Sequence, residues 1–166
     1  MKKTSFLVLT AGFTLIELMV AITLLALLMG GGIAGYIRVN DRQNLVNAGK
    51  NVQLFMREAQ KKARVGERPA ASAGCGALVS YQLKTSATLD QVNLNAECDN
   101  AVTSLIDSYT FPNGVVASSA FDMHFYALQG GVKNSGQVVL HSKTRSYTFT
   151  VDGGGSIGDA VVAPYP

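Results

Sequence analysis

Apolar positions divide this chain of 166 residues into two parts. From Phe13 to Ile37 nearly every residue is apolar or small, and Glu17 is the one charged side chain in the run. A helix of that length spans roughly 37 Å, enough to cross a bilayer with some tilt. The pattern therefore predicts a membrane-spanning helix over residues 13–37, with a carboxylate near its beginning.

After Ile37 the pattern becomes amphipathic. Apolar residues recur at spacings of three, four and seven at Leu45, Val52, Phe55, Met56, Ala59 and Ala63. This periodicity is typical of a helix with one buried face. Gly66 and Pro69 are helix-ending residues. We therefore expect one continuous helix from Phe13 to about Val65, with an amphipathic half over residues 38–65.

The remaining sequence has the pattern of short strands separated by Gly, Asn, Asp, Pro or Ser. The runs are Ala77–Leu83, Gln91–Ala96, Ser104–Phe111, Gly114–Ser118, Phe121–Leu128, Gln137–Ser142 and Ser146–Val151. Lys143 to Arg145 is a plausible hairpin turn. The expected fold class is α+β, with the long helix packed on one β-rich domain over residues 66–166.

The first twelve residues, Met1 to Gly12, resemble the start of an export signal. They contain Lys2 and Lys3, a weakly apolar middle and no acid. An ordinary signal peptide would end there, whereas here the main apolar run begins after Gly12. The lysines are expected to hold the amino end in the cytoplasm, so that the chain after Arg38 lies outside.

Two cysteines, Cys75 and Cys98, lie in the polar part of the chain. An exported domain meets an oxidising compartment, where these two residues can form one disulfide. Closing such a loop is worth about 3 kcal/mol in the chain-entropy model. Two unpaired buried thiols are the alternative.

The stretch GFTLIE, residues 12–17, followed by an unbroken apolar helix, resembles the class III signal of type IV pilins and type II secretion pseudopilins. The resemblance implies a pilin-like fold and a leader over residues 1–12. It also implies that a prepilin peptidase cuts between Gly12 and Phe13 and methylates the new amine of Phe13. With the leader removed, the side-chain charge falls from +3 to about +1.

Glu17 would be the fifth residue of the mature chain, and the resemblance implies a role in assembly. In a staggered filament its carboxylate can approach the cationic amine of a neighbouring subunit, away from water. The alternative is that Glu17 lies at the lipid headgroup level. The glycines at 30, 31, 32 and 35 either lower the stability of the helix locally or allow close packing against another helix.

The carboxyl-terminal segment 124–158 is similar to the ending of H-type minor pseudopilins and related minor pilins, in which an aromatic strand, a glycine turn and two strands close the domain. Main fibre subunits usually have a disulfide near the carboxyl terminus, but both cysteines here precede residue 100.

The expected function is structural. We expect a minor pseudopilin or minor pilin in a type II secretion or type IV pilus-like filament, anchored in the inner membrane with a periplasmic or extracellular domain. The partners implied are prepilin peptidase, other pilin or pseudopilin subunits and the assembly platform. No enzyme activity and no cofactor are expected. The alternative is a filament-tip adhesin or a DNA-binding minor pilin, although the near-neutral charge argues against nucleic-acid binding through a basic surface.

Other groups of residues look like binding or metal sites but are not interpreted as such. Gly153, Gly155 and Gly158 match GxGxxG, but too few residues follow for the helix that a phosphate-binding loop needs. Asp152 and Asp159 flank these glycines, but two carboxylates are too few to form a calcium site. His124 and His141 have no metal-ligand spacing with a cysteine. The basic cluster Lys61, Lys62, Arg64 and Arg68 is interpreted as a solvated helix end, with a partner or DNA contact as the alternative.

Overall fold

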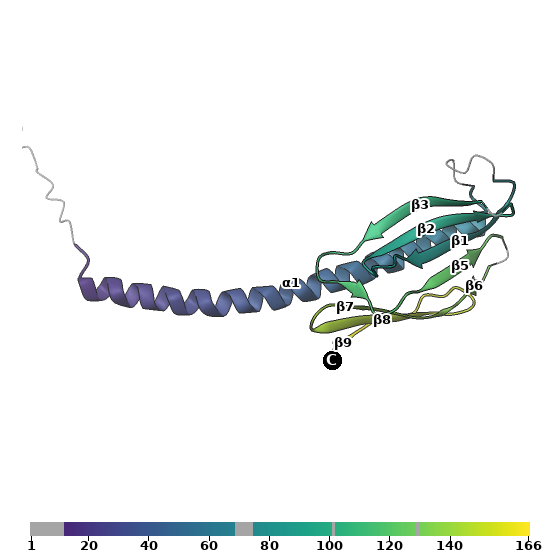
Figure 1. The fold of residues 1–166 in the computed structure, drawn as a ribbon. Coiled ribbons are helices and arrows are strands. Elements are labelled where there is room, and N and C mark those ends of the chain that lie inside the picture. Colours follow the sequence, from purple (N-terminus) through teal and green to yellow (C-terminus); the bar gives the residue numbers. More distant parts are fainter. Residues whose placement is uncertain (1–11, 69–74, 101, 129) are drawn as a thin grey trace, which may run out of the picture. The chain divides into compact units, whose positions relative to one another are not determined.

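The computed structural model describes residues 12–68, 75–100, 102–128 and 130–166, with the backbone alone described for residues 30–34 (Figure 1). All of the predicted leader except Gly12, and also Pro69, lie outside the described residues. The chain forms two compact units, Met1–Val39 and Asn40–Pro166.

Among the described residues there is one long helix, α1 (Leu15–Val65), which begins two residues later than expected. It confirms the predicted helical conformation, whereas the membrane-spanning role of its first half stays a prediction. Its carboxyl end has a Schellman motif: the N–H of Glu67 donates to the carbonyl of Lys62, and the N–H of Gly66 to that of Ala63. Gly66 has a φ of +63°, which glycine adopts without strain. Gly66 therefore ends the helix as its position in the sequence predicts.

Nine strands follow the helix in the described part of the chain. They are β1 (Leu78–Thr85), β2 (Gln91–Cys98), β3 (Thr103–Thr110), β4 (Val116–Ala117), β5 (Asp122–Tyr126), β6 (Val132–Lys133), β7 (Gly136–His141), β8 (Arg145–Val151) and β9 (Val161–Pro164). All seven predicted strands are present with shifted ends, whereas β6 and β9 were not predicted. The α+β fold class is confirmed.

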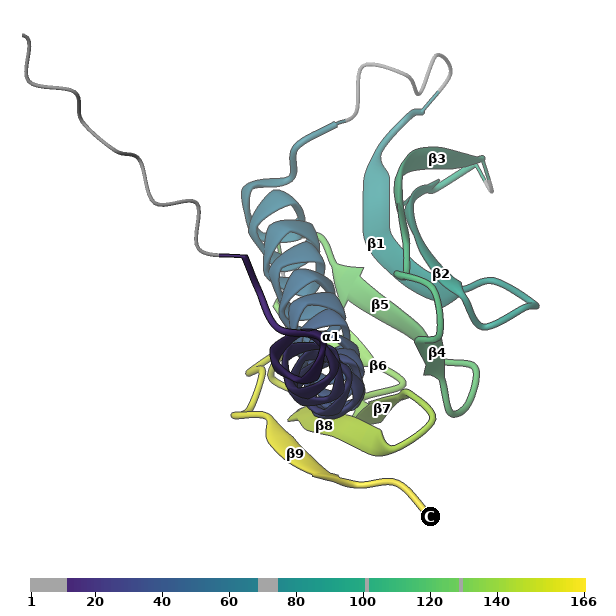
Figure 2. The same cartoon turned by 90° about the vertical axis from the view of Figure 1, so that its left-hand side faces the viewer.

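The strands form two antiparallel sheets. One has the order β3-β2-β1-β5-β6 and the other the order β4-β7-β8-β9. Within the Asn40–Pro166 unit, Figure 2 shows the two sheets on two sides of the helix. The N–H of Val132 in β6 donates to the carbonyl of Gly153 after β8, which joins the ends of the two sheets.

The core of this unit lies between the amphipathic half of α1 and the inner faces of both sheets. The predicted helix face is buried at Leu45, Val52, Met56, Ala59 and Ala63, and Phe55 is half-buried. Alternate residues of the strands face the same core, as β2 shows with its strictly alternating burial. The helix and the sheets therefore share one hydrophobic cluster.

Side chains of α1 also hold the loops of the sheets by hydrogen bonds. The carboxylate of Asp41 accepts from Ser142 at 2.8 Å and from Thr144 at 2.9 Å, both in the turn between β7 and β8. The hydroxyl of Tyr81 in β1 donates to the carbonyl of Glu67 just after the helix, at 2.7 Å. These contacts fix both ends of the amphipathic half on the β-rich part.

Candidate assembly site

The peptide bond between Gly12 and Phe13 lies in a short segment that precedes α1. Residues 12–14 have no regular secondary structure. Phe13 is 82 % exposed, and nothing lies within 4 Å of a Cβ built on Gly12. Exposed segments without regular structure are the preferred substrates of proteases. Among the described residues, none therefore covers the predicted cleavage bond.

The first turn of α1 is capped by Thr14. Its hydroxyl accepts a hydrogen bond from the N–H of Glu17 at 3.3 Å, and its carbonyl accepts from Leu18 at 3.2 Å. Thr14 and Glu17 have the spacing of a capping box, in which the acid also favours the positive end of the helix dipole. Glu17 thus occupies the third helical position and is exposed.

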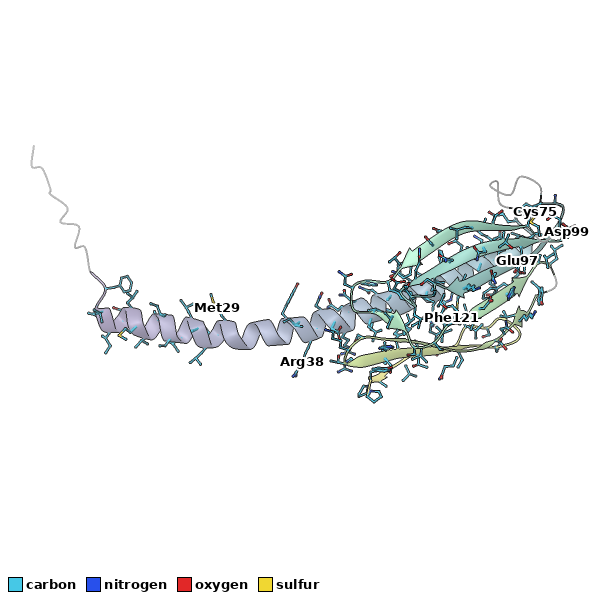
Figure 3. All side chains as sticks on the ribbon, viewed as in Figure 1. Met29, Arg38, Cys75, Glu97, Asp99 and Phe121 are labelled. Atoms are coloured by element: carbon cyan, nitrogen blue, oxygen red, sulfur yellow. A yellow bond between two sulfur atoms is a disulfide. The ribbon has the colours of Figure 1, made fainter. Side chains whose placement is uncertain are left out.

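Large apolar side chains cover all sides of the beginning of α1, both before and after Glu17. Those from Phe13 to Met29 are between 52 and 82 % exposed: Phe13, Leu15, Ile16, Leu18, Met19, Val20, Ile22, Leu24, Leu25, Leu27, Leu28 and Met29. Figure 3 shows Met29 projecting from α1. A helix that is apolar all round requires burial by other molecules. Among the described residues, no helix contains a stretch long and apolar enough to cross a membrane.

A polar network covers the outer face of the five-stranded sheet. His124 Nδ1 lies 2.8 Å from Glu97 Oε2, and His124 Nε2 lies 3.1 Å from Asp122 Oδ1. Ser80 donates to the same Glu97 oxygen. Since Ser80 contacts Glu97 and not the imidazole, the set lacks the nucleophile–base pair of a hydrolase. Within the described part of the chain, no group of three or more such side chains is placed to hold a metal ion.

The second histidine, His141 in β7, stacks on Tyr165, with ring centroids 4.1 Å apart and planes 8° apart. Its Nδ1 lies 3.2 Å from the carbonyl oxygen of Ser142. These contacts anchor the chain after β9 onto the four-stranded sheet.

The glycine-rich segment after β8 is a docking loop for the helix. Gln60 Nε2 donates to the carbonyl of Gly155 at 2.8 Å, and Gln53 Nε2 to that of Gly158 at 3.1 Å. A Cβ on Gly155 would lie 2.5 Å from Gln60 Nε2. Gly155 also has a φ of +85°, which glycine adopts without strain, so the backbone conformation of this turn favours glycine here. Asp152 Oδ1 accepts from the N–H of Ser156, which closes the turn.

The predicted basic cluster is only partly solvated. Lys62 Nζ pairs with Glu58 Oε1 at 2.9 Å, and this hydrogen bond raises the pKa of Lys62. Lys61, Arg64 and Arg68 are exposed. The cluster thus combines one helix ion pair with three cations that face solvent.

Cys75 and Cys98 are joined by a disulfide in the structure, with Cα atoms 5.4 Å apart. Cys98 is buried at the end of β2. The next residue, Asp99, accepts from the N–H of Ala77 at 3.0 Å, so that it holds the segment after Cys75 (Figure 3).

Comparison with known proteins points to the amino-terminal part of the chain. Residues 9–33 match the family model of the prokaryotic N-terminal methylation motif. This is a prepilin signal. The motif indicates a type IV pilin-like or pseudopilin protein that prepilin peptidase processes and that assembles with other pilins. No curated protein matches the chain, and no solved structure matches it.

The prepilin signal coincides with the predicted cleavage bond and the capped apolar helix. Sequence reasoning found Gly12, Phe13 and Glu17 but not the cap at Thr14, although a Thr three residues before a Glu is its signature. Within the Asn40–Pro166 unit, His124 pairs with Glu97 and His141 lies beside the carbonyl of Ser142, so the two histidines belong to separate sets of contacts.

Proposed function

We propose that this chain is a minor pseudopilin or minor pilin of the H type, assembled into a type II secretion pseudopilus or a type IV pilus-like filament. Prepilin peptidase cuts it between Gly12 and Phe13 and methylates the amine of Phe13. The carrying observation is the match of residues 9–33 to the methylation motif at an exposed, non-helical cleavage bond.

Assembly uses the apolar surface of α1. The subunit waits in the inner membrane with its amino end in the cytoplasm and its β-rich unit outside. An assembly platform then transfers it into the filament, where neighbouring helices replace lipid around the exposed side chains between Phe13 and Met29. Their exposure in the single chain supports this role.

Glu17 sets the register between subunits. Its carboxylate neutralises the methylated amine of Phe13 on a neighbouring subunit. Support comes from its exposure in the first helical turn, which leaves the carboxylate free to meet a partner. No hydrogen bond or ion pair occupies that carboxylate within the described residues.

A minor position in the filament fits the placement of the disulfide. Cys75 and Cys98 join the start of β1 to the end of β2 and leave the carboxyl-terminal strands without a covalent link. Main fibre subunits usually have that link near the carboxyl terminus.

Intact mass of the protein coexpressed with prepilin peptidase tests this function. The mature form is expected to lack residues 1–12 and to carry one additional methyl group. Gly12→Val should leave the leader in place, because the prepilin signal has a glycine immediately before the bond that the peptidase cuts. An unprocessed wild-type chain, or one cut elsewhere, contradicts the proposal.

A second candidate is DNA binding at a filament tip. The exposed face of α1 carries Lys50, Arg57, Lys61 and Arg64 at spacings of seven, four and three, which place them on one side of the helix. No ion pair involves them within the described residues. A gel-shift titration against salt tests this candidate, because four phosphate contacts predict a slope of roughly −3 to −4 in log K against log salt.

A further inference from the structure

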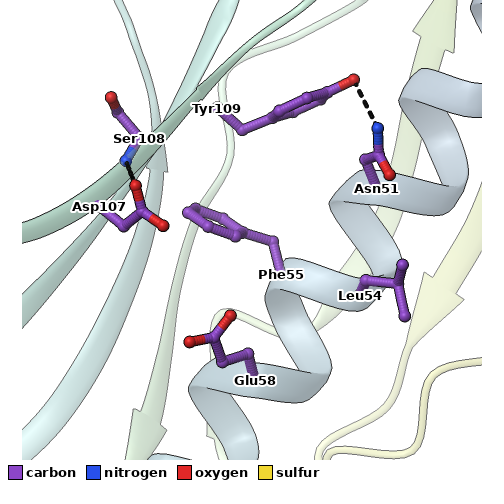
Figure 4. Close-up of a pocket in the computed structure, with 7 residues that line it drawn as sticks. All are labelled: Asn51, Leu54, Phe55, Glu58, Asp107, Ser108 and Tyr109. Atoms are coloured by element: carbon purple, nitrogen blue, oxygen red, sulfur yellow. Dashed lines mark hydrogen bonds between the residues drawn. The ribbon is translucent and has the colours of Figure 1, made fainter.

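A groove runs between the amphipathic half of α1 and the edge strand β3 (Figure 4). We call it the α1–β3 groove. Its volume is about 390 Å³, and it is lined by Asn51, Leu54, Phe55, Glu58, Asp107, Ser108 and Tyr109. All of these residues belong to the Asn40–Pro166 unit.

Apolar side chains form much of the groove wall. Leu54 is an apolar side chain that is 58 % exposed, whereas the helix positions around it are either buried or polar. Phe55 and Tyr109 are half-buried. Asn51 Nδ2 donates to the Tyr109 hydroxyl at 3.0 Å and fixes that ring across the groove (Figure 4). The wall is therefore preformed and has apolar area that a partner can cover.

The charges that line the groove are all negative. Asp107 accepts from the N–H of Ser108 at 2.7 Å and has no cation partner among the described residues. Glu58 is the only other charged side chain in the lining, and it pairs with Lys62 on the helix. An incoming cation can share Glu58 and pair with Asp107, so that the groove selects a basic side chain.

The backbone of β3 adds a second form of recognition. β3 is the outer strand of its sheet, and within the described residues only β2 pairs with it. Its sequence, TSLIDSYT, contains no Lys, Arg or Pro, and Asp107 is its one charged residue. Leu105 is 60 % exposed on the same strand. A register shift opposite Leu94 and Asn95 separates Thr103–Leu105 from Asp107–Thr110, which borders the groove.

We propose that an extended segment of a sister filament subunit binds the α1–β3 groove by strand addition to Asp107–Thr110. A Lys or Arg of that segment pairs with Asp107, and an apolar side chain packs on Leu54 and Phe55. Main-chain hydrogen bonds to the edge provide affinity, and the two side-chain contacts provide specificity.

Among the described residues, the chain's other edge strands do not have this chemistry. β4 and β9 contain no Lys or Arg. β6 contains Lys133 but is two residues long, and the N–H of its Val132 is bonded to Gly153. The occupant is therefore a different subunit. This inference rests on the proposed function, because it requires a filament that brings other subunits beside this one.

Photocrosslinking of the full chain in cells that assemble the filament tests the inference. A benzophenone amino acid replaces Ser108, and mass spectrometry identifies the joined peptide. We expect a segment of another subunit that contains a Lys or Arg and forms a strand. Crosslinks only to a helix, to lipid, to nucleic acid or to a second copy of this chain overturn the inference.

Two charge variants make the test sharper. Asp107→Lys is expected to lower the crosslink yield about fivefold, the loss that corresponds to one partly exposed ion pair. Asp159→Lys changes the charge equally on an exposed loop outside the groove and should keep the parental yield. Asp107→Asn is a smaller change at the same position, and its yield should fall between that of Asp107→Lys and that of the parent. Equal yields for Asp107→Lys and Asp159→Lys overturn the inference.

Processing and filament incorporation are measured on the same samples. If the chain loses its leader and enters the filament but Ser108 gives no crosslink, the groove inference fails and the proposed function stands. If the chain is neither cut nor incorporated, the proposed function itself fails.

Discussion

Gly49 of α1 lies directly against the ring of Tyr147 in β8, so closely that a Cβ at Gly49 would be 2.3 Å from ring atoms Cδ1 and Cε1. Both residues are buried. Glycine in a helix costs up to about 1 kcal/mol relative to alanine. The close contact between helix and sheet leaves no space for a side chain at position 49. This explains why the helix has a glycine there despite its low helix propensity.

Gly49→Ala is therefore expected to destabilise the protein despite the better helix propensity of alanine. Overpacking a core typically costs about 1–3 kcal/mol. Thermal unfolding of the full chain in detergent, followed by circular dichroism, should show a lower midpoint. Asn47→Ala, at an exposed position of the same helix, is the control and should not lower the midpoint. A Gly49→Ala variant as stable as the parent would contradict the close contact.

Local periodicity explains why most elements could be predicted. The helix repeats over many turns, and β2 and β8 alternate apolar and polar residues, so their sequence alone indicates which of their side chains face the core. β6 and β9 lack this signal. β6 is two residues long and exists through its pairing with β5, and β9 is the short run Val161–Pro164 without alternation. Their existence depends on neighbours that are distant in sequence.

The residues of the candidate site also divide into those that a local sequence pattern predicts and those that only the folded chain brings together. Gly12, Phe13 and Glu17 could be predicted because the prepilin signal is a linear motif. The α1–β3 groove could not, since Asn51 and Tyr109 are 58 residues apart and meet only in the folded chain. The docking of the glycine-rich loop by Gln53 and Gln60 had no sequence signal either, because Gln is common on helix surfaces.

Gln53 connects the helix to two parts of the four-stranded sheet. Its side-chain amide donates to Gly158 and its side-chain oxygen accepts from the Tyr147 hydroxyl at 3.1 Å. Gln53→Leu removes both bonds and leaves a buried hydroxyl without its acceptor, which costs about 1–3 kcal/mol. The urea midpoint should fall accordingly. Gln43→Leu, at an exposed helix position, should leave it nearly unchanged; equal midpoints for the two variants would disprove the bridging role.

Burial raises the pKa of both Tyr81 and Tyr147 above the ordinary value of 10.0. Their hydroxyls keep their protons in the folded state at a pH where the unfolded chain has lost them. Stability from this source is complete below pH 10.0 and is lost as pH rises through the folded-state values.

Above pH 10.0 the free energy of unfolding of the parent protein should therefore fall more steeply than that of a Tyr147→Phe variant. The variant has one titrating hydroxyl fewer. Denaturant titrations from neutral to alkaline pH measure both slopes. Tyr126→Phe is the control, because Tyr126 is exposed. If Tyr147→Phe and the parent have the same alkaline slope, the buried hydroxyl does not contribute.

The Cys75–Cys98 disulfide closes a loop with a sequence separation of 23 residues. Replacing both cysteines with serine should cost about 3 kcal/mol of unfolding free energy. The parent protein in reducing agent should show the same loss, whereas the double variant should not respond to the reductant. Alkylation and intact mass of the non-reduced protein check the bridge, and two free thiols in protein from an oxidising compartment would refute it.

Glu17 has two candidate roles, in its own helix and in the filament. As an acid in the first turn it stabilises α1 by about 0.3–1 kcal/mol through the helix dipole. Glu17→Gln keeps the side-chain length and removes the charge, so a pairing with the amine of a neighbouring Phe13 should be abolished. We expect the variant to be cut and methylated normally but to be nearly absent from filaments, as measured by the fraction of mature protein in sheared fibres.

Thr14→Val separates the two roles. It removes the hydroxyl that accepts from the N–H of Glu17 and keeps both the shape of the side chain and the charge of Glu17. The loss of this cap costs about 1 kcal/mol in the helix, yet it leaves the intersubunit ion pair intact. Among molecules that the peptidase has processed, Thr14→Val should therefore enter filaments close to the parental level. If Thr14→Val and Glu17→Gln are excluded equally, helix capping at the amino end controls assembly and the charge pairing does not.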